Sequence, residues 1–344
     1  MSKQIILTAD DFGCCDFIDD GIEFALRKGK INSVAVFVTH KDSAERIKKL
    51  LRLKKELQGG PNGNFGIGLH FSITSGQAIS GKSSLTIFTE ITEKEKYFRE
   101  AFGYDFLLSK KEDLEAELIA QLDLIRSILG DEPVDHLSHH HGIIYLSNRL
   151  FNVYTRTLNH YNKRHNIDIP VRSPVSWFRK FTSRTGNNGT ELDKKCKTCF
   201  SEYDNMLLTP AAIEGMKLMM WKKLAQTTVG VMDNRMEKIK TENLRSPNLL
   251  CDLIYGQPDL KNLEYLINHY NNETLLDCMK FDPFSAEFMF HLGQGQLDKN
   301  KVPHGINFDY FEYRIKELQE LNAFNLEKYI NDYGIEKVTY SAIK

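Results

Sequence analysis

Residues 4–13 read QIILTADDFG, a short apolar run that stops at two adjacent acidic residues, a phenylalanine and a glycine. A run of this length, rich in aliphatic and β-branched side chains and followed by a polar turn, predicts a buried strand over residues 4–9. Asp10 and Asp11 then lie at the carboxyl end of that strand. Such a pair by itself is most often a turn or a helix N-cap, so its role depends on the rest of the chain.

Helical and strand-like patterns alternate outward from this stretch. Helical periodicity recurs at residues 16–28, 43–58, 114–129 and 147–163, and further helices are expected between about 308 and 332. Strand-like runs lie between these ranges, at 33–38, 65–71, 133–138, 167–172 and 287–292. Repeated strand and helix alternation favours an α/β fold with a largely parallel sheet. A chain of 344 residues is long enough for a (β/α) barrel as well as for an open sheet.

The alternation is lost between about residues 173 and 285, and we interpret this region as an insertion in a single domain that spans residues 1–344. The insertion contains Cys196 and Cys199, whose spacing is found in zinc sites. A structural zinc site needs a second pair of ligands, and neither a second such pair nor a closely spaced histidine follows. We therefore expect no metal at this cysteine pair.

Composition excludes several classes of partner. The 45 Lys and Arg residues nearly balance the 46 Asp and Glu residues, for a formal charge of −1, so no net field favours nucleic acid or anionic lipid. No stretch approaches the ~20 apolar residues of a membrane helix, and the N-terminus lacks the apolar core of a signal peptide. We expect a cytoplasmic protein with reduced thiols, without a nucleic-acid or membrane partner.

Ionisable side chains collect at the ends of four predicted strands: Asp10 and Asp11, His70, His139 to His141, and His291. In parallel α/β folds the carboxyl ends of the strands share one rim, where active sites are built. One carboxylate and two imidazoles on such a rim suit a catalytic divalent cation, with Zn²⁺, Mn²⁺, Fe²⁺ or Co²⁺ more natural than Mg²⁺. Of the two adjacent aspartates, one can bind the cation while the other acts as a general base.

The same motifs resemble the YdjC-like carbohydrate deacetylases, a family that includes chito-oligosaccharide deacetylases. The similarity covers nearly the whole chain and rests on ADDFG at 9–13, GLHF at 68–71, SHHH at 138–141 and EFMFH at 287–291. The resemblance implies a distorted TIM-like barrel, a homodimer, and removal of N-acetyl groups from an amino sugar or oligosaccharide that depends on a divalent cation, Mg²⁺ by family likeness.

Site roles follow from the resemblance position by position. It implies metal ligation by Asp11, His70 and His139, a general base at Asp10 and a general acid at His291. Arg172 resembles an arginine that orients the base or the substrate. The segment DHLSHHHG at 135–142 departs from the family pattern, so His141 is an alternative ligand to His139.

Two other functions stay open at this point. An Asp and His rim also suits a metal-dependent phosphoesterase or another amidohydrolase. The departures from the family pattern also allow a sugar-binding homologue without turnover.

Overall fold

The computed structural model describes residues 3–60, 62–81, 89–91, 96–98, 110–175, 234–251, 284–297 and 310–343. The predicted pair Cys196 and Cys199, and most of the region from 173 to 285, lie outside these ranges. Among the described helices, none is long and apolar enough to cross a membrane.

The described strands form one parallel sheet and a separate small hairpin. The sheet contains β1 (Lys3–Phe12), β2 (Ser33–Val36), β3 (Gly66–Phe71), β6 (Leu137–His139), β7 (Leu249–Cys251), β8 (Phe284–Phe290) and β9 (Ile335–Lys337). Its strand order is β6-β3-β2-β1-β8-β7, with β9 paired to the start of β1. The hairpin pairs β4 (Thr89–Ile91) with β5 (Lys96–Phe98). The predicted α/β fold with a parallel sheet is confirmed, and the sheet curves into a half-barrel.

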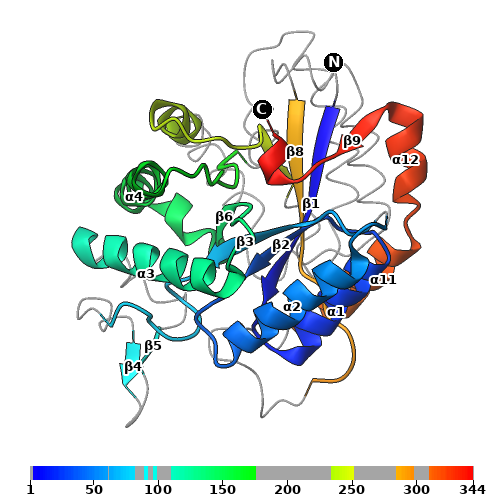
Figure 1. Cartoon of the computed structure of the whole chain (residues 1–344), viewed down its shortest axis with the longest axis horizontal. Coiled ribbons are helices and arrows are strands. Elements are labelled where there is room, and N and C mark those ends of the chain that lie inside the picture. The colour runs from blue at the N-terminus through cyan, green and yellow to red at the C-terminus, as the bar shows by residue number, and fades with distance from the viewer. Residues whose placement is uncertain are drawn as a thin grey trace, which may run out of the picture.

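Helices cover the outer face of the sheet in chain order. They are α1 (Asp16–Arg27), α2 (Ser43–Leu57), α3 (Lys111–Leu129), α4 (Asn148–His165), α11 (Phe311–Ala323) and α12 (Leu326–Tyr333). Figure 1 shows α1 and α2 beside β1 and β2, with α3 and α4 following toward β3 and β6. Short 3-10 segments occupy His140–Leu146 and Tyr340–Ala342.

The central strand β1 is buried on both faces. Ile5, Leu7 and Ala9 belong to the large core beneath the helices. Ile6, which points the other way, packs with Val338, Tyr340 and Ile343 in a second, smaller core. Because successive side chains of a strand alternate between faces, an almost continuous apolar run is what a strand covered on both sides requires.

The predicted strand at 167–172 is reduced to a bridge between Val171 and Leu137. Pro170 has no N–H to donate to a ladder, which disfavours a regular strand. The segment that follows still bonds to both ends of the sheet. The N–H of Arg172 donates to the carbonyl of Leu137 at 3.0 Å, and the N–H of Leu250 donates to the carbonyl of Val175 at 2.9 Å.

The helices predicted at about 308–332 are α11 and α12. The break falls at Phe324 and Asn325, where the Asn325 side chain accepts the N–H of Lys328 at 3.3 Å and caps the second helix. Asparagine is a favoured N-cap residue because its side-chain oxygen replaces a missing helix partner.

Candidate metal centre

An irregularity at the end of β1 brings both aspartates to the same site. The register of β1 against β2 shifts between Ala9 and Phe12, and Asp11 has a φ of 74°. In a regular strand Asp10 and Asp11 would point to opposite faces, but a bulge with a left-handed residue redirects one of them. As a result, His70 Nε2 lies 3.3 Å from Asp11 Oδ1 and 3.9 Å from Asp10 Oδ2. Strained backbone of this kind is common at functional sites.

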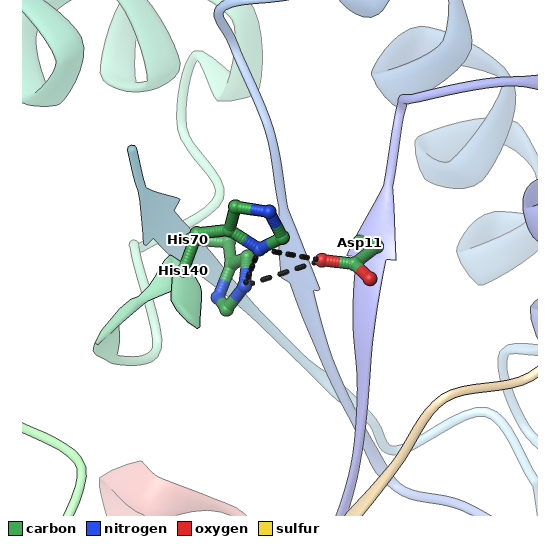
Figure 2. Close-up of side chains that lie close together, drawn as sticks. All are labelled: Asp11, His70 and His140. Atoms are coloured by element: carbon green, nitrogen blue, oxygen red, sulfur yellow. Dashed lines mark hydrogen bonds and ion pairs between the residues drawn. The ribbon is translucent and has the colours of Figure 1, made fainter. Parts of the chain in front are cut away.

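Asp11, His70 and His140 converge from three strands of the parallel sheet, as Figure 2 shows. Asp11 comes from β1, His70 from β3, and His140 follows the last residue of β6. The His140 Nδ1 atom lies 3.2 Å from Asp11 Oδ1 and 3.3 Å from His70 Nε2. With the 3.3 Å between Asp11 Oδ1 and His70 Nε2, the three atoms form a nearly equilateral triangle.

The triangle fits a bound divalent cation. Tetrahedral ligands at ~2.0–2.1 Å from a zinc-like ion lie about 3.3 Å apart, whereas adjacent ligands of an octahedral Mg²⁺ lie about 2.9 Å apart. All three side chains are at most 7% exposed. Asp11 Oδ1 is buried and makes no hydrogen bond of good geometry within the described part of the chain. A buried acceptor facing two imidazole nitrogens is the arrangement that a cation would satisfy.

Ser138 fixes the orientation of His70. The Oγ atom of Ser138 lies 2.8 Å from His70 Nδ1 and 3.5 Å from the carbonyl oxygen of Leu69. If the hydroxyl donates to that carbonyl, it accepts the Nδ1–H of His70. The Nε2 lone pair of His70 is then directed at Asp11 and His140, as metal ligation requires.

Arg314 on α11 contacts the other oxygen of Asp11. Its Nη2 atom donates to Asp11 Oδ2, which leaves Oδ1 for the two histidines. Burial raises the pKa of the Asp11 carboxyl, but Arg314 and His140 outweigh burial and hold that pKa well below its ordinary value. The carboxylate is therefore ionised and offers one oxygen to a cation. Arg314 lies in a helical stretch with no local motif, so sequence reasoning missed it.

Asp10 is held by Arg172 through two hydrogen bonds. Arg172 Nη1 donates to Asp10 Oδ2 at 2.6 Å, and Nη2 donates to Oδ1 at 2.7 Å. Burial raises the pKa of Asp10, but the Arg172 guanidinium more than offsets it, so that the pKa falls well below its ordinary value. Each carboxylate oxygen keeps lone-pair capacity for a further donor. The family resemblance suggested that Arg172 orients the base or the substrate, and in the structure Arg172 contacts Asp10.

His291 follows β8 and completes the rim. The backbone N–H of His291 donates to Glu317 Oε1 on α11 at 2.8 Å. Burial lowers the pKa of the imidazole to about 3, against the opposing influence of Asp11 and Asp10. The imidazole is therefore neutral near pH 7, and the negative charges of Asp11 and Asp10 act on it. The sequence did not indicate Glu317, which is fully buried in an amphipathic helix.

The geometry favours His140 over the two histidines that sequence reasoning considered as ligands. The His139 ring, at the end of β6, packs edge-on against Tyr145 with 4.1 Å between centroids. The His141 side chain is exposed, and its Nδ1 atom lies 3.1 Å from Thr74 Oγ1. The His141 ring lies against the His140 ring, with 3.7 Å between centroids, but it is the His140 Nδ1 atom that lies within 3.3 Å of both Asp11 Oδ1 and His70 Nε2. The triplet alone does not reveal which of the three histidines does so.

We expect His140→Ala to weaken divalent-cation binding by more than about 100-fold. Removing a residue that only orients a metal ligand costs up to about 100-fold, and removing a ligand itself should cost more. His139→Ala and His141→Ala should stay within a few-fold of the unmodified protein, because neither residue supplies an atom to the cluster of Asp11, His70 and His140. Metal titration of the apo-protein with a competing chelator measures all three. Tight binding by His140→Ala together with loss in His139→Ala would reverse the assignment.

Fold and site together define an α/β protein with a candidate divalent-cation centre at the carboxyl ends of parallel strands. More particularly, the chain belongs to the family of YdjC-like proteins, whose family model matches residues 4–332. It is 30% identical over 141 residues to a carbohydrate deacetylase from Geobacillus stearothermophilus, covering 41% of this chain and 51% of that protein. A chitooligosaccharide deacetylase from Enterobacter sp. (strain 638) is 29% identical over 141 residues, with 41% and 50% coverage. The match spans about half the length of these curated relatives.

One solved structure resembles the chain along its whole length. It is a candidate cellobiose-phosphate cleavage protein from Enterococcus faecalis V583, with a TM-score of 0.62, 16% identity and 99% coverage of both chains. At this identity the likeness concerns the fold.

Proposed function

We propose that this protein is a hydrolase that removes N-acetyl groups from amino sugars or chito-oligosaccharides and depends on a divalent cation. The observation that carries the proposal is the buried cluster of Asp11, His70 and His140, with the ionised Asp10 beside it. Membership in the YdjC-like family supports it, because curated relatives are named carbohydrate and chitooligosaccharide deacetylases. A phosphoesterase or a silent sugar-binding protein has no observation of its own in its favour.

Asp11, His70 and His140 would hold the cation. When bound there, a divalent cation supplies a Lewis acid that polarises the amide carbonyl and lowers the pKa of water. Asp10 is held in place by Arg172 and stays ionised, so it can accept a proton from the attacking water as general base. Loss of a proton to Asp10 makes the water a nucleophile toward the acetyl carbon.

His291 is the proposed proton donor to the departing amine. It lies on the same rim as Asp10 and is neutral near pH 7, so it donates only after it has accepted a proton, namely the one that Asp10 takes from the attacking water. Glu317 holds the backbone of His291 in place. Acetate and a free amino sugar are the products, and the proton taken by the base is returned to the amine in the overall reaction.

We propose Zn²⁺, Mn²⁺ or Co²⁺ as the favoured cation ahead of Mg²⁺, the ion that family likeness suggests. Two of the three ligand atoms are imidazole nitrogens, and the three ligand atoms lie 3.2–3.3 Å from one another, which supports this choice. We expect metal-stripped protein to recover less activity with Mg²⁺ than with the other three ions at equal concentration. Higher activity with Mg²⁺ would support the family assignment of the ion instead.

The closure of the barrel, the oligomeric state and the location are proposed as well. The bonds of residues 170–175 to β6 and to β7 support a distorted TIM-like barrel, closed by this segment. A homodimer and a cytoplasmic location stay predictions, the first from the family resemblance and the second from the sequence. Light scattering of the purified chain measures the first.

The test of the reaction is acetate release from N-acetylated mono- and oligosaccharides, using metal-stripped protein to which single cations are restored. Phosphoesters are screened in parallel. Acetate that depends on the cation establishes the proposed reaction. Phosphate release without acetate would establish the phosphoesterase instead, and saccharide binding without either product would indicate the silent homologue.

A further inference from the structure

We propose that Tyr340 and Glu287 are positioning residues for Asp10, acting through Arg172, so that the segment from β9 to Ile343 helps to build the catalytic rim. The inference rests on the proposed role of Asp10 as general base. The four side chains form an unbroken chain of hydrogen bonds from Tyr340 to Asp10.

Arg172 is shared between two carboxylates. Its Nη1 and Nη2 atoms bond to Asp10, while Nε lies 3.0 and 3.1 Å from the two oxygens of Glu287 and Nη2 lies 2.7 Å from Glu287 Oε1. A guanidinium is planar and presents its donors as a rigid fork. Because Glu287 holds the edge formed by Nε and Nη2, the adjacent edge formed by Nη1 and Nη2 can meet Asp10 in only one orientation. Glu287 therefore determines where the Asp10 carboxylate lies.

Glu287 in turn is held by Tyr340. The Tyr340 hydroxyl donates to Glu287 Oε2, and both residues are completely buried. Asp10 and Glu287 share the single guanidinium of Arg172, and the Tyr340 hydroxyl gives Glu287 a further donor. Without that hydroxyl, Glu287 would keep a buried oxygen with one donor fewer, which is costly at zero exposure. The guanidinium would be expected to shift toward Glu287 and away from Asp10.

The fold seats Tyr340 with several dedicated contacts. The His136 ring stacks on the Tyr340 ring at 4.3 Å and 15°. Asp135 accepts the N–H of Tyr340 at 3.3 Å and that of Ser341 at 3.1 Å. Gly68 on β3 makes room for this stack, since a Cβ there would lie 2.3 Å from His136 Nδ1. Gly68 of the GLHF motif thus leaves space for the stack of His136 on Tyr340, while His70 of the same motif belongs to the cluster at the rim.

A purely structural role would not need this arrangement. Ile6, Val338 and Ile343 surround Tyr340 with an apolar core that a phenylalanine would fill equally well. Burying a tyrosine, two carboxylates and a guanidinium instead costs desolvation, which an apolar replacement would avoid. The network ends at Asp10 on the rim.

The first experiment compares Tyr340→Phe and Glu287→Gln with the unmodified enzyme. We expect kcat to fall about 10-fold and about 100-fold, respectively, as is typical for outer-shell partners and for small misplacements of a reacting group. KM and cation affinity should change little, because the side chains of Asp11, His70 and His140 keep their contacts. Tyr161→Phe is the matched control: the buried Tyr161 donates to Asp123 at 2.7 Å between α3 and α4, away from the rim.

A double-mutant cycle shows whether the effect passes through Asp10. In an Asp10→Asn background, Tyr340→Phe should cause no further loss of kcat, since partners that act as a unit are not additive. Unchanged kcat in Tyr340→Phe, or the same fractional loss in both backgrounds, would overturn the inference. Melting temperatures identify any variant that is simply unfolded.

A second readout does not depend on the substrate. In protein labelled with ¹⁵N-arginine, the Nε–H resonance of Arg172 is identified by its loss in Arg172→Lys. We expect Tyr340→Phe to shift this resonance and Tyr161→Phe to leave it unchanged. An unshifted resonance contradicts the inference even if the enzyme acts on another substrate. Failure of acetate release by the unmodified protein, with a shifted resonance, would sink only the proposed function.

Discussion

Asp11→Asn is expected to reduce divalent-cation affinity by more than about 100-fold and to abolish cation-dependent turnover. The substitution removes the charge that faces His70 and His140, while the amide oxygen can still accept from Arg314. Asparagine is preferable to alanine here because Asp11 has a φ of 74°, which asparagine tolerates better than other residues with a Cβ. Metal titration and acetate release measure the two effects.

Asp42→Asn is the matched control for this substitution. Asp42 also has a left-handed φ, of 64°, but it is exposed at the start of α2. Its replacement changes charge and backbone preference in the same way without touching the cluster, so cation affinity should stay unchanged. If Asp11→Asn also binds the cation as tightly as the unmodified protein, the cluster of Asp11, His70 and His140 is not the metal site.

Much of the fold could be predicted from periodicity because the strongest signals are local. The helix at 16–28 and the strand at 65–71 match α1 and β3 within a residue. The strand at 167–172 failed because its pairing depends on which segments lie beside it, and Pro170 weakens it locally. Periodicity predicted helices at about 308–332 but could not place the break between them at Asn325, since an asparagine inside a helical pattern is not by itself a cap.

The candidate site was predictable in position but not in detail. Parallel strands share a rim, so the sequence predicts Asp10, Asp11, His70 and His291 together; His70 Nε2 lies 3.3 Å from Asp11 Oδ1 and 3.9 Å from Asp10 Oδ2, and His291 follows β8, which pairs with β1. The choice of His140 depends on the turn after β6, which the repeated histidines do not encode. Arg314 contacts Asp11, which lies more than 300 residues away along the chain. Tyr340 is linked to the site through Glu287. Only the tertiary fold brings them there.

Asp10→Asn is expected to lower kcat by about 10²- to 10⁴-fold, the range that general-base catalysis contributes. The amide has one acceptor oxygen in place of two, so Arg172 loses a bond and the proton acceptor is removed. Cation affinity should change little, because Asp10 Oδ2 lies 3.9 Å from His70 Nε2 and the three ligand atoms belong to other residues. Single-turnover acetate release and metal titration, made on the same preparation, separate the two quantities.

Asp168→Asn provides the comparison for Asp10→Asn, since Asp168 also pairs with an arginine, Arg245, but on the exposed surface. It should retain full turnover, which would show that losing an ion pair does not by itself impair the enzyme. Near-normal kcat in Asp10→Asn would assign the proton acceptor to another group, and the Arg172 contact would then orient substrate or structure alone. Loss of cation and turnover together would instead make Asp10 a ligand. A large loss of kcat with the cation retained is the result that places Asp10 at the proton transfer. Retained cation shows that the ligand triangle is intact, so the lost kcat is due to the missing proton acceptor.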